Sequence, residues 1–188
     1  MDKLTAIFLA EGCEEVESLT TVDLLRRAKV PVTMVAIGTT REVTGSHGIR
    51  ITADTTISEI HFDDYDMLIL PGGIPGTPNL AACKPLTDAL LDFAAKGKEI
   101  AAICAAPSIL ADLGILRGRT AACNPSKEDV LLAGGANLVQ DPVAEDNNII
   151  TSRAMGTAVP FGLRIVAHYR GREAAEALRN NILFTGEG

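Results

Sequence analysis

The chain has 188 residues, a formal charge of -7, a hydrophobic share of 47% and an aromatic share of 4% without tryptophan. This length supports one hydrophobic core, so we expect a single domain over residues 1–188. The acidic charge and the scarcity of aromatic side chains disfavour nucleic acid and anionic membranes as stable partners. Small molecules or other proteins are the expected partners.

The N-terminal segment 1–12 is too short and too quickly acidic for a secretory signal, and no apolar run approaches the length of a membrane span. We therefore expect a cytoplasmic protein. The cysteines are widely scattered and form no Cys-x-x-Cys pair, which predicts free thiols and neither a zinc knuckle nor a disulfide framework. They are Cys13, Cys83, Cys104 and Cys123.

Short β-rich runs alternate with amphipathic stretches along the chain. Strands are predicted over residues 4–9, 32–37, 67–70, 100–103, 119–123 and 149–152. Helices are predicted over residues 15–28, 85–95, 107–113, 126–132, 157–169 and 172–183. Segment 41–52 contains Gly45 and Gly48 between β-favouring residues and predicts a hairpin. This alternation predicts an α/β fold with a mostly parallel sheet and helices on both faces.

The sequence also predicts the placement of particular side chains in two of these helices. Helical spacing in segment 15–28 places Val16 and Leu19 toward the core, so Glu17 borders the buried face. In the helix over residues 126–132, Ser126 is the expected N-cap.

Cys104 ends an apolar run and is followed by Ala105, Ala106 and Pro107, which predicts a turn from a strand into a helix. At such a turn a side chain lies beside free backbone N–H groups, which favour a thiolate and hence a nucleophile. A small buried core residue explains the same run equally well, because free cysteines are often buried. The local sequence leaves both interpretations open.

Two other loops follow predicted strands at the same edge of the sheet, which is where ligands bind in parallel α/β folds. In the first, Glu17 can act as a proton shuttle to a thiolate, or it can simply complement the helix dipole. In the second, Gly72 and Gly73 can present backbone N–H groups to an oxyanion, or they can form an ordinary tight turn. The second loop lacks the Lys-Ser or Lys-Thr ending of a phosphate-binding loop.

The three histidines, His47, His61 and His168, are isolated in the sequence and none lies next to Cys104. His47, in the predicted hairpin, is the best candidate to meet Cys104 in space, although a solvated surface role also fits each histidine. The HxH and HExxH patterns are absent, so no metal site is predicted.

Four segments together resemble the ThiJ/PfpI superfamily, in particular its Parkinson-disease-associated protein deglycase and YajL-like branch. They are Ala10–Glu17, Leu70–Gly73, Ala102–Pro107 and Thr151–Thr157. The resemblance covers nearly the whole chain and implies a flavodoxin-like α/β sandwich that forms a homodimer.

The resemblance also implies roles for individual residues. Cys104 matches the reactive cysteine, Glu17 its acidic partner, and the backbone N–H groups of Gly73 and Ala105 the oxyanion donors. Ala105 directly after the cysteine counts against the peptidase-like branch, which has histidine there.

Three further positions depart from the family pattern or match its contacts near the dimer interface. Asn124 replaces a histidine that some relatives carry near the site, which leaves proton transfer to Glu17. His47 stands where relatives often have an arginine, and Arg27 matches a second arginine. The resemblance implies that His47 approaches the partner subunit's site, whereas Arg27 is equally well explained as a solvated cation near a helix end.

The resemblance implies a cofactor-independent enzyme that acts on reactive aldehydes, or on their early adducts with amines and thiols, as a glyoxalase or deglycase. Cys104 is also expected to sense oxidation. The alternatives are a redox-regulated chaperone or stress-response protein without turnover, and a binding module with an inert Cys104. The sequence does not set the physiological substrate.

Overall fold

The computed structural model describes residues 4–186 and contains a central seven-stranded sheet. Its strands are β1 (Thr5–Leu9), β2 (Val32–Ala36), β5 (Thr55–Thr56), β6 (Met67–Leu70), β7 (Glu99–Ile103), β10 (Val143–Asp146) and β11 (Ile149–Ser152). The strand order is β10-β11-β7-β6-β1-β2-β5. All neighbouring pairs are parallel except the antiparallel β10–β11 pair. The predicted fold class, a mostly parallel sheet of flavodoxin-like type, is confirmed.

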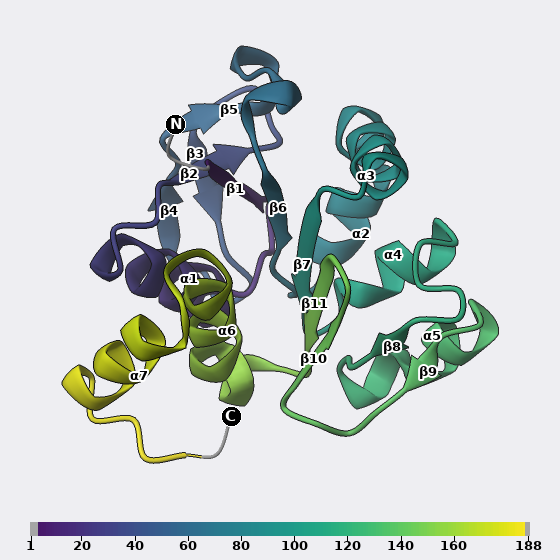
Figure 1. The fold of residues 1–188 in the computed structure, drawn as a ribbon. Helices are drawn as coiled ribbons and strands as arrows, with labels where there is room; N and C mark the ends of the chain where they lie inside the picture. The colour runs from purple at the N-terminus through teal and green to yellow at the C-terminus, as the bar shows by residue number, and fades with distance from the viewer. Residues whose placement is uncertain (1–3, 187–188) are drawn as a thin grey trace.

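Helices cover both faces of this sheet (Figure 1). One face carries α1 (Glu15–Arg27) and α6 (Ala158–Arg170), with α7 (Arg172–Asn181) packed on α6. The other carries α2 (Gly76–Ala82), α3 (Lys84–Lys96), α4 (Pro107–Asp112) and α5 (Glu128–Ala133). No helix among the described residues is long and apolar enough to cross a membrane.

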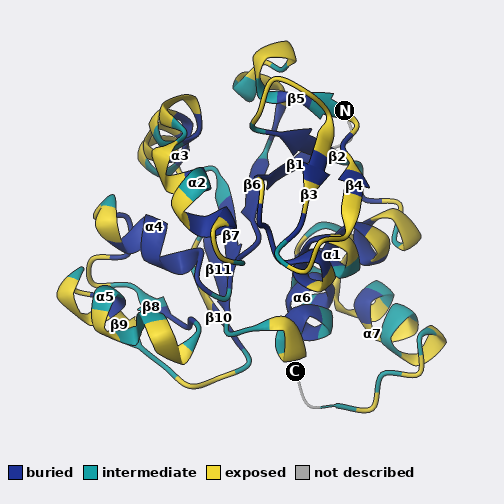
Figure 2. Ribbon diagram, turned by 180° about the vertical axis from the view of Figure 1, so that it is seen from behind, coloured by how far each residue is buried: buried dark blue, intermediate teal, exposed yellow. Residues whose placement is uncertain are grey.

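The core consists of two layers, one on each side of the sheet, because successive strand residues point to opposite faces. On β1, Ile7 belongs to the layer under α1 and α6, whereas Phe8 belongs to the layer under α3 and α4. The strands are buried throughout their centre, as Figure 2 shows in dark blue. Strands covered on both faces read as continuous apolar runs, which is why Met67–Leu70 was recognisable from sequence.

Two small sheets lie outside the central one. The predicted hairpin over residues 41–52 is present as β3 (Glu42–Thr44) paired antiparallel with β4 (Arg50–Thr52). The strand predicted over residues 119–123 is only β8 (Thr120–Ala121), which pairs with β9 (Asn137–Leu138). Residues 4–186 also contain four short 3₁₀ turns: η1 (Ile57–Glu59), η2 (Phe62–Asp64), η3 (Pro125–Lys127) and η4 (Met155–Thr157).

Two predictions about the helices are wrong. Val16 and Leu19 are 44% and 39% exposed, because the face of α1 that meets the rest of the protein carries Glu17 and Ser18 at this end. Ser126 does not cap α5, since the chain first forms η3, and the Asn124 side chain accepts the N–H of Ser126 there. In α1 the polar Glu17 takes the buried position that was expected for Val16. Before α5, Asn124 acts as the cap that was expected to be Ser126.

Candidate active site

Cys104 directly follows β7, at the predicted turn into α4. Its φ of 65° is in the left-handed region, which is unfavourable for a residue with a side chain. The backbone is held in this conformation on both sides: the Cys104 N–H donates to Ser152 O at 3.0 Å, and its carbonyl accepts the N–H of Asn124 at 2.8 Å. The turn therefore fixes the direction in which the sulfur points.

Glu17 reaches the same point from the first turn of α1. It is 1% exposed, and its Oε2 accepts the Gly72 N–H at 2.9 Å. A methyl group on Gly72 would lie 2.7 Å from Cys104 Cβ and 2.9 Å from Glu17 Oε2. Gly72 is thus needed because the loop after β6, the cysteine turn and the acid meet at that position.

The next residue, Gly73, has a φ of 97°, and a methyl group there would lie 2.4 Å from Glu14 N. The Gly73 N–H and the Ala105 N–H both lie within hydrogen-bonding reach of the Cys104 sulfur. The structure therefore brings Cys104, Glu17 and the backbone groups of Gly72, Gly73 and Ala105 into one cluster at the carboxyl edge of the sheet.

The acid and the thiol in this cluster influence each other's protonation. Burial raises the pKa of Glu17 to about 7, although the Gly72 N–H and Cys104 lower it. Burial, followed by the charge and hydrogen bonding of Glu17, raises the pKa of Cys104 to about 12, and the Ala105 and Gly73 N–H groups only partly offset this. A thiolate therefore forms most readily when Glu17 carries the proton, because two adjacent buried anions repel each other.

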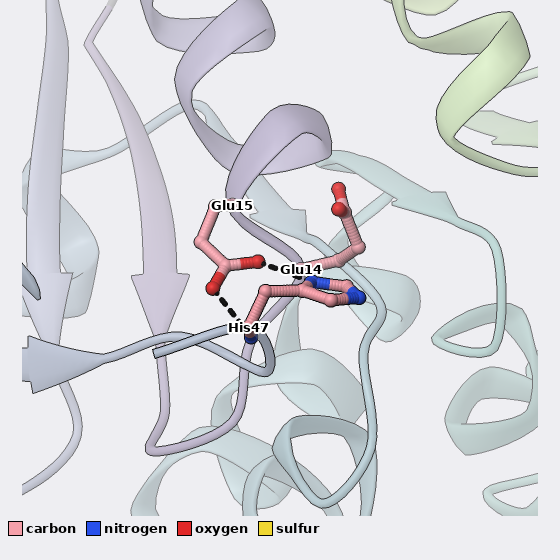
Figure 3. Close-up of side chains that lie close together, drawn as sticks. All are labelled: Glu14, Glu15 and His47. Atoms are coloured by element: carbon pink, nitrogen blue, oxygen red, sulfur yellow. Dashed lines mark hydrogen bonds and ion pairs between the residues drawn. The ribbon is translucent and has the colours of Figure 1, made fainter. Parts of the chain in front are cut away.

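A second carboxylate on the same helix turn has different surroundings (Figure 3). Glu15 is 2% exposed, and its Oε1 accepts the His47 N–H at 2.7 Å while its Oε2 lies 2.9 Å from His47 Nδ1. Burial opposes its ionisation, yet these contacts with His47 hold the pKa of Glu15 at about 2. The exposed His47 ring is therefore attached to α1 through Glu15 and does not pair with Cys104.

Glu14, Glu15 and His47 also form a group of side chains with metal-ligating atoms within 4.8 Å of one another. Their contacts are explained without an ion, because Glu15 pairs with His47 and Glu14 Oε2 caps α1 by accepting the Glu17 N–H at 2.6 Å. We assign no metal to this group.

The other two predicted contact residues lie at the periphery. Arg27 is half exposed near the end of α1 and pairs with Asp23. Asn124 adjoins the cysteine turn through its backbone, while its side-chain oxygen accepts hydrogen bonds from Ser126 N and Oγ. Arg27 therefore forms an ion pair at the surface, and the Asn124 side chain caps the short turn η3.

Sequence reasoning assigned no role to Arg153, which directly follows β11. Its signal was its position: an arginine immediately after a predicted strand at the same edge of the sheet as Cys104. A separate cavity of about 550 Å³ is lined by α6, α7 and Phe184, and Cys104 and Glu17 are not among its lining residues. The cluster of Cys104 and Glu17 and this cavity therefore lie in different parts of the protein.

The model of the DJ-1/PfpI family matches residues 3–168. The chain belongs to the DJ-1/PfpI family. This confirms the resemblance found in the sequence motifs.

Family members in several organisms are similar over most of this chain. Protein dj-1beta of Drosophila melanogaster is 33% identical over 97% of this chain and 98% of its own length. Its crystal structure superposes with a TM-score of 0.93 at 34% identity, covering 99% of this chain and 100% of that one. The glutathione-independent glyoxalase DJR-1.2 of Caenorhabditis elegans is 34% identical over 89% of both chains.

Protein DJ-1 homolog A of Arabidopsis thaliana is 38% identical over 89% of this chain, which spans only 42% of that protein. The family therefore includes members of this size and members in which a similar region is part of a longer protein.

Proposed function

We propose that this DJ-1/PfpI protein is a cofactor-independent enzyme in which Cys104 converts small 2-oxoaldehydes such as methylglyoxal into hydroxy acids. The supporting observation is the convergence of a strained cysteine, a buried acid and two inward-facing backbone N–H groups. A relative named as a glutathione-independent glyoxalase supports the same activity.

The reaction begins when the Cys104 thiolate attacks the aldehyde carbon and Glu17 holds the displaced thiol proton. The N–H groups of Gly73 and Ala105 stabilise the oxygen anion, which then takes the proton held by Glu17 and gives a hemithioacetal. Glu17, ionised again, removes the hydrogen on that carbon, the hydroxyl proton passes to the ketone oxygen, and Glu17 returns its proton to the neighbouring carbon, giving a thioester of the hydroxy acid. Water hydrolyses the thioester, releasing lactate from methylglyoxal and restoring the thiol.

Glu17 suits this proton transfer because its raised pKa, about 7, lies near neutral pH. One of its oxygens, Oε2, is fixed by Gly72, while Oε1 is buried and has no hydrogen-bond partner within residues 4–186. The free oxygen can carry the proton in one step and accept it in the next. Early adducts of the same aldehydes with amines and thiols are substrates of the same chemistry, as in a deglycase.

The proposal includes a cytoplasmic homodimer. Val16 and Leu19 form an exposed apolar strip on α1, and Ile49 is exposed in the neighbouring hairpin. A second copy covering this strip would bring His47 and Arg27 near the interface that the family resemblance implies. Sedimentation at micromolar concentration tests this, and a monomer would contradict it.

Oxidation sensing at Cys104 is the second candidate, supported by its partial exposure beside Glu17, whereas Cys13 and Cys123 are buried. Mild peroxide followed by intact-mass and peptide measurement should add two oxygens to Cys104 alone. Equal oxidation of all four cysteines would rule this candidate out.

The enzymatic proposal is tested by product analysis of methylglyoxal turnover. Cys104→Ala should abolish lactate formation, and Cys83→Ala, a partly buried cysteine between α2 and α3, serves as the matched control. A buffer blank is needed because early glycation adducts fall apart when free aldehyde is removed. Lactate formation by Cys104→Ala at the wild-type rate would disprove the mechanism.

A further inference from the structure

Arg153 and Cys104 leave neighbouring strands at the same level of the sheet. Strands β11 and β7 are parallel, with Ser152 opposite Ile103, so the next residues in each chain segment are Arg153 and Cys104. The Cys104 N–H donates to Ser152 O at 3.0 Å, which ties the two turns together. Since adjacent strands are about 4.8 Å apart, an arginine side chain starting there is long enough to reach a molecule bound to Cys104.

The Arg153 guanidinium has few strong contacts of its own. Its Nη2 lies 3.7 Å from Glu128 Oε1, and its Nη1 lies 3.5 Å from Gln140 O. Its Nε is buried and has no hydrogen-bond partner in the described part of the chain. Charge-assisted hydrogen bonds are ordinarily about 2.7–2.9 Å long, so this cation retains unused hydrogen-bonding capacity.

The acid beside Arg153 is already engaged elsewhere. Glu128 Oε1 accepts the Gln140 Nε2–H at 3.0 Å, a shorter contact than the one with Arg153. The backbone of Arg153, by contrast, is fixed, because Thr157 Oγ1 accepts the N–H groups of Arg153 and Ala154 at 3.2 and 3.0 Å. The base of the side chain is therefore anchored while its charged end can exchange a weak partner for a stronger one at little cost.

The opposite side of the site is acidic. Glu14, Glu15 and Glu17 lie at the start of α1, and none of these carboxyl groups can attract the anionic end of a substrate. The Arg153 side chain is 28% exposed, and its backbone lies beside Cys104 at the end of the neighbouring strand β11. A guanidinium binds a carboxylate through two parallel hydrogen bonds, which also fixes its orientation.

Resting on the function proposed above, we propose that Arg153 is a specificity-determining residue that binds a carboxylate on the substrate. The favoured substrates are then 2-oxoaldehydes with a carboxylate a few bonds from the carbonyl pair, such as 4,5-dioxopentanoate. The chemistry at Cys104 is the same: the aldehyde carbon is oxidised to an acid, the ketone is reduced to an alcohol, and one water is consumed. The product from 4,5-dioxopentanoate is 2-hydroxyglutarate.

The first test does not require turnover. Iodoacetate and iodoacetamide both alkylate Cys104 with loss of iodide and differ in carrying a carboxylate or a neutral amide. The ratio of their rates at Cys104, measured by peptide mass, should fall about tenfold in Arg153→Gln at low salt. Should that variant not fold, Arg153→Met, which keeps the apolar stem, gives the same readout.

Arg119→Gln is the matched control. Arg119 is also 28% exposed and also faces an acid, Asp146 at 4.0 Å, but Asp146 lies opposite Ile149 at the other end of β11. The ratio should be unchanged in this variant. An unchanged ratio in Arg153→Gln overturns the proposal, and so does an equal fall in Arg119→Gln, because net charge alone would then explain it.

The second test measures substrate preference. In the wild type, kcat/KM for 4,5-dioxopentanoate should exceed that for methylglyoxal, and Arg153→Gln should lower this preference about tenfold, mainly through KM. An unaltered preference in Arg153→Gln would overturn the proposal that Arg153 binds the substrate carboxylate. Failure of the proposed function looks different: the wild type would turn over neither aldehyde, while the alkylation ratio would still report on Arg153.

Discussion

Glu15 and Glu17 lie on the same turn of α1, are 2% and 1% exposed, and hold their protons very differently. The pKa of Glu17 is raised to about 7, whereas that of Glu15 is lowered to about 2. Burial disfavours ionisation in both. The difference lies in the partners: Glu15 has an imidazole and the His47 N–H, whereas Glu17 has one backbone N–H and a thiol that competes for the proton.

Burial alone therefore does not identify a catalytic acid. A buried carboxylate whose charge is fully compensated is a structural anchor, as Glu15 is for the hairpin. A buried carboxylate with an oxygen left free beside a nucleophile is suited to proton transfer, as Glu17 is. Changing the two residues to glutamine in turn tests this distinction.

The largest effect is expected in catalysis by Glu17→Gln. Glutamine keeps the shape but cannot carry the proton, so kcat for lactate formation should fall about 100-fold or more. Steady-state kinetics with methylglyoxal measure this. His61→Gln, in the segment before the amino end of β6, whereas Cys104 follows the carboxyl end of β7, should behave as wild type. A wild-type kcat in Glu17→Gln would show that Glu17 does not transfer the proton in this reaction.

The next effect is on stability, in Glu15→Gln. The change replaces a buried anion that binds His47 through two contacts, and we expect a loss of about 2 kcal/mol in the free energy of unfolding. Urea denaturation at neutral pH measures it. If Glu15→Gln were as stable as the wild type, Glu15 would not anchor the hairpin.

A smaller effect is expected in the pH dependence of stability, with opposite signs for the two acids. The pKa of Glu15 falls from 4.5 to about 2 on folding, so its contribution is present above about pH 4.5 and is lost as the pH falls toward 2. The pKa of Glu17 rises from 4.5 to about 7, so its contribution is full below about pH 4.5 and is lost as the pH rises through 7.

Urea denaturation across this pH range, in wild type and both glutamine variants, checks these signs. Between pH 4.5 and 7 the wild type should lose stability relative to Glu17→Gln. Below pH 4.5 it should lose stability relative to Glu15→Gln. Parallel curves for all three proteins would show that the two acids titrate alike in the folded and unfolded states.

The smallest effect is expected from His47→Gln. The ring is exposed, and its own pKa is raised by hydrogen bonding and charge from Glu15. Removing it should raise the pKa of Glu15 while the backbone contact remains, which moves the acid-unfolding midpoint to higher pH. Acid titration followed by circular dichroism measures this midpoint. A midpoint that did not move would mean that the His47 N–H, and not the ring, holds Glu15 ionised.

Much of the architecture could be read from the sequence. The apolar runs of β1, β6 and β7 and the Gly72-Gly73 pair after β6 are local signals, and the structure contains the predicted strands and this turn. The edge strand β10 was missed because Val143–Asp146 is short and half polar, so its identity depends on pairing with β11. Helix α2 was missed because Gly76 and Pro78 weaken its helical signal.

Placement of side chains was less predictable. Helical periodicity indicated that α1 has a buried face but assigned Val16 to it, because periodicity measures apolar spacing and not what a face meets. At this end α1 meets the loops after β6 and β7, so the polar Glu17 is the residue that is enclosed. Arg153 was passed over for a similar reason, since its weak contacts with Glu128 and Gln140 exist only in the folded chain.

The sequence by itself determined the fold class, the order of most strands and helices, and the turn from a strand into a helix at Cys104. Only the tertiary structure decided that the glycine loop meets Cys104 and that the neighbouring Glu15 and Glu17 hold their protons so differently. The physical reason is that a pKa depends on desolvation and on nearby donors. The donors come from His47 and Gly72, which lie 2.7 and 2.9 Å from Glu15 and Glu17 only once the chain has folded.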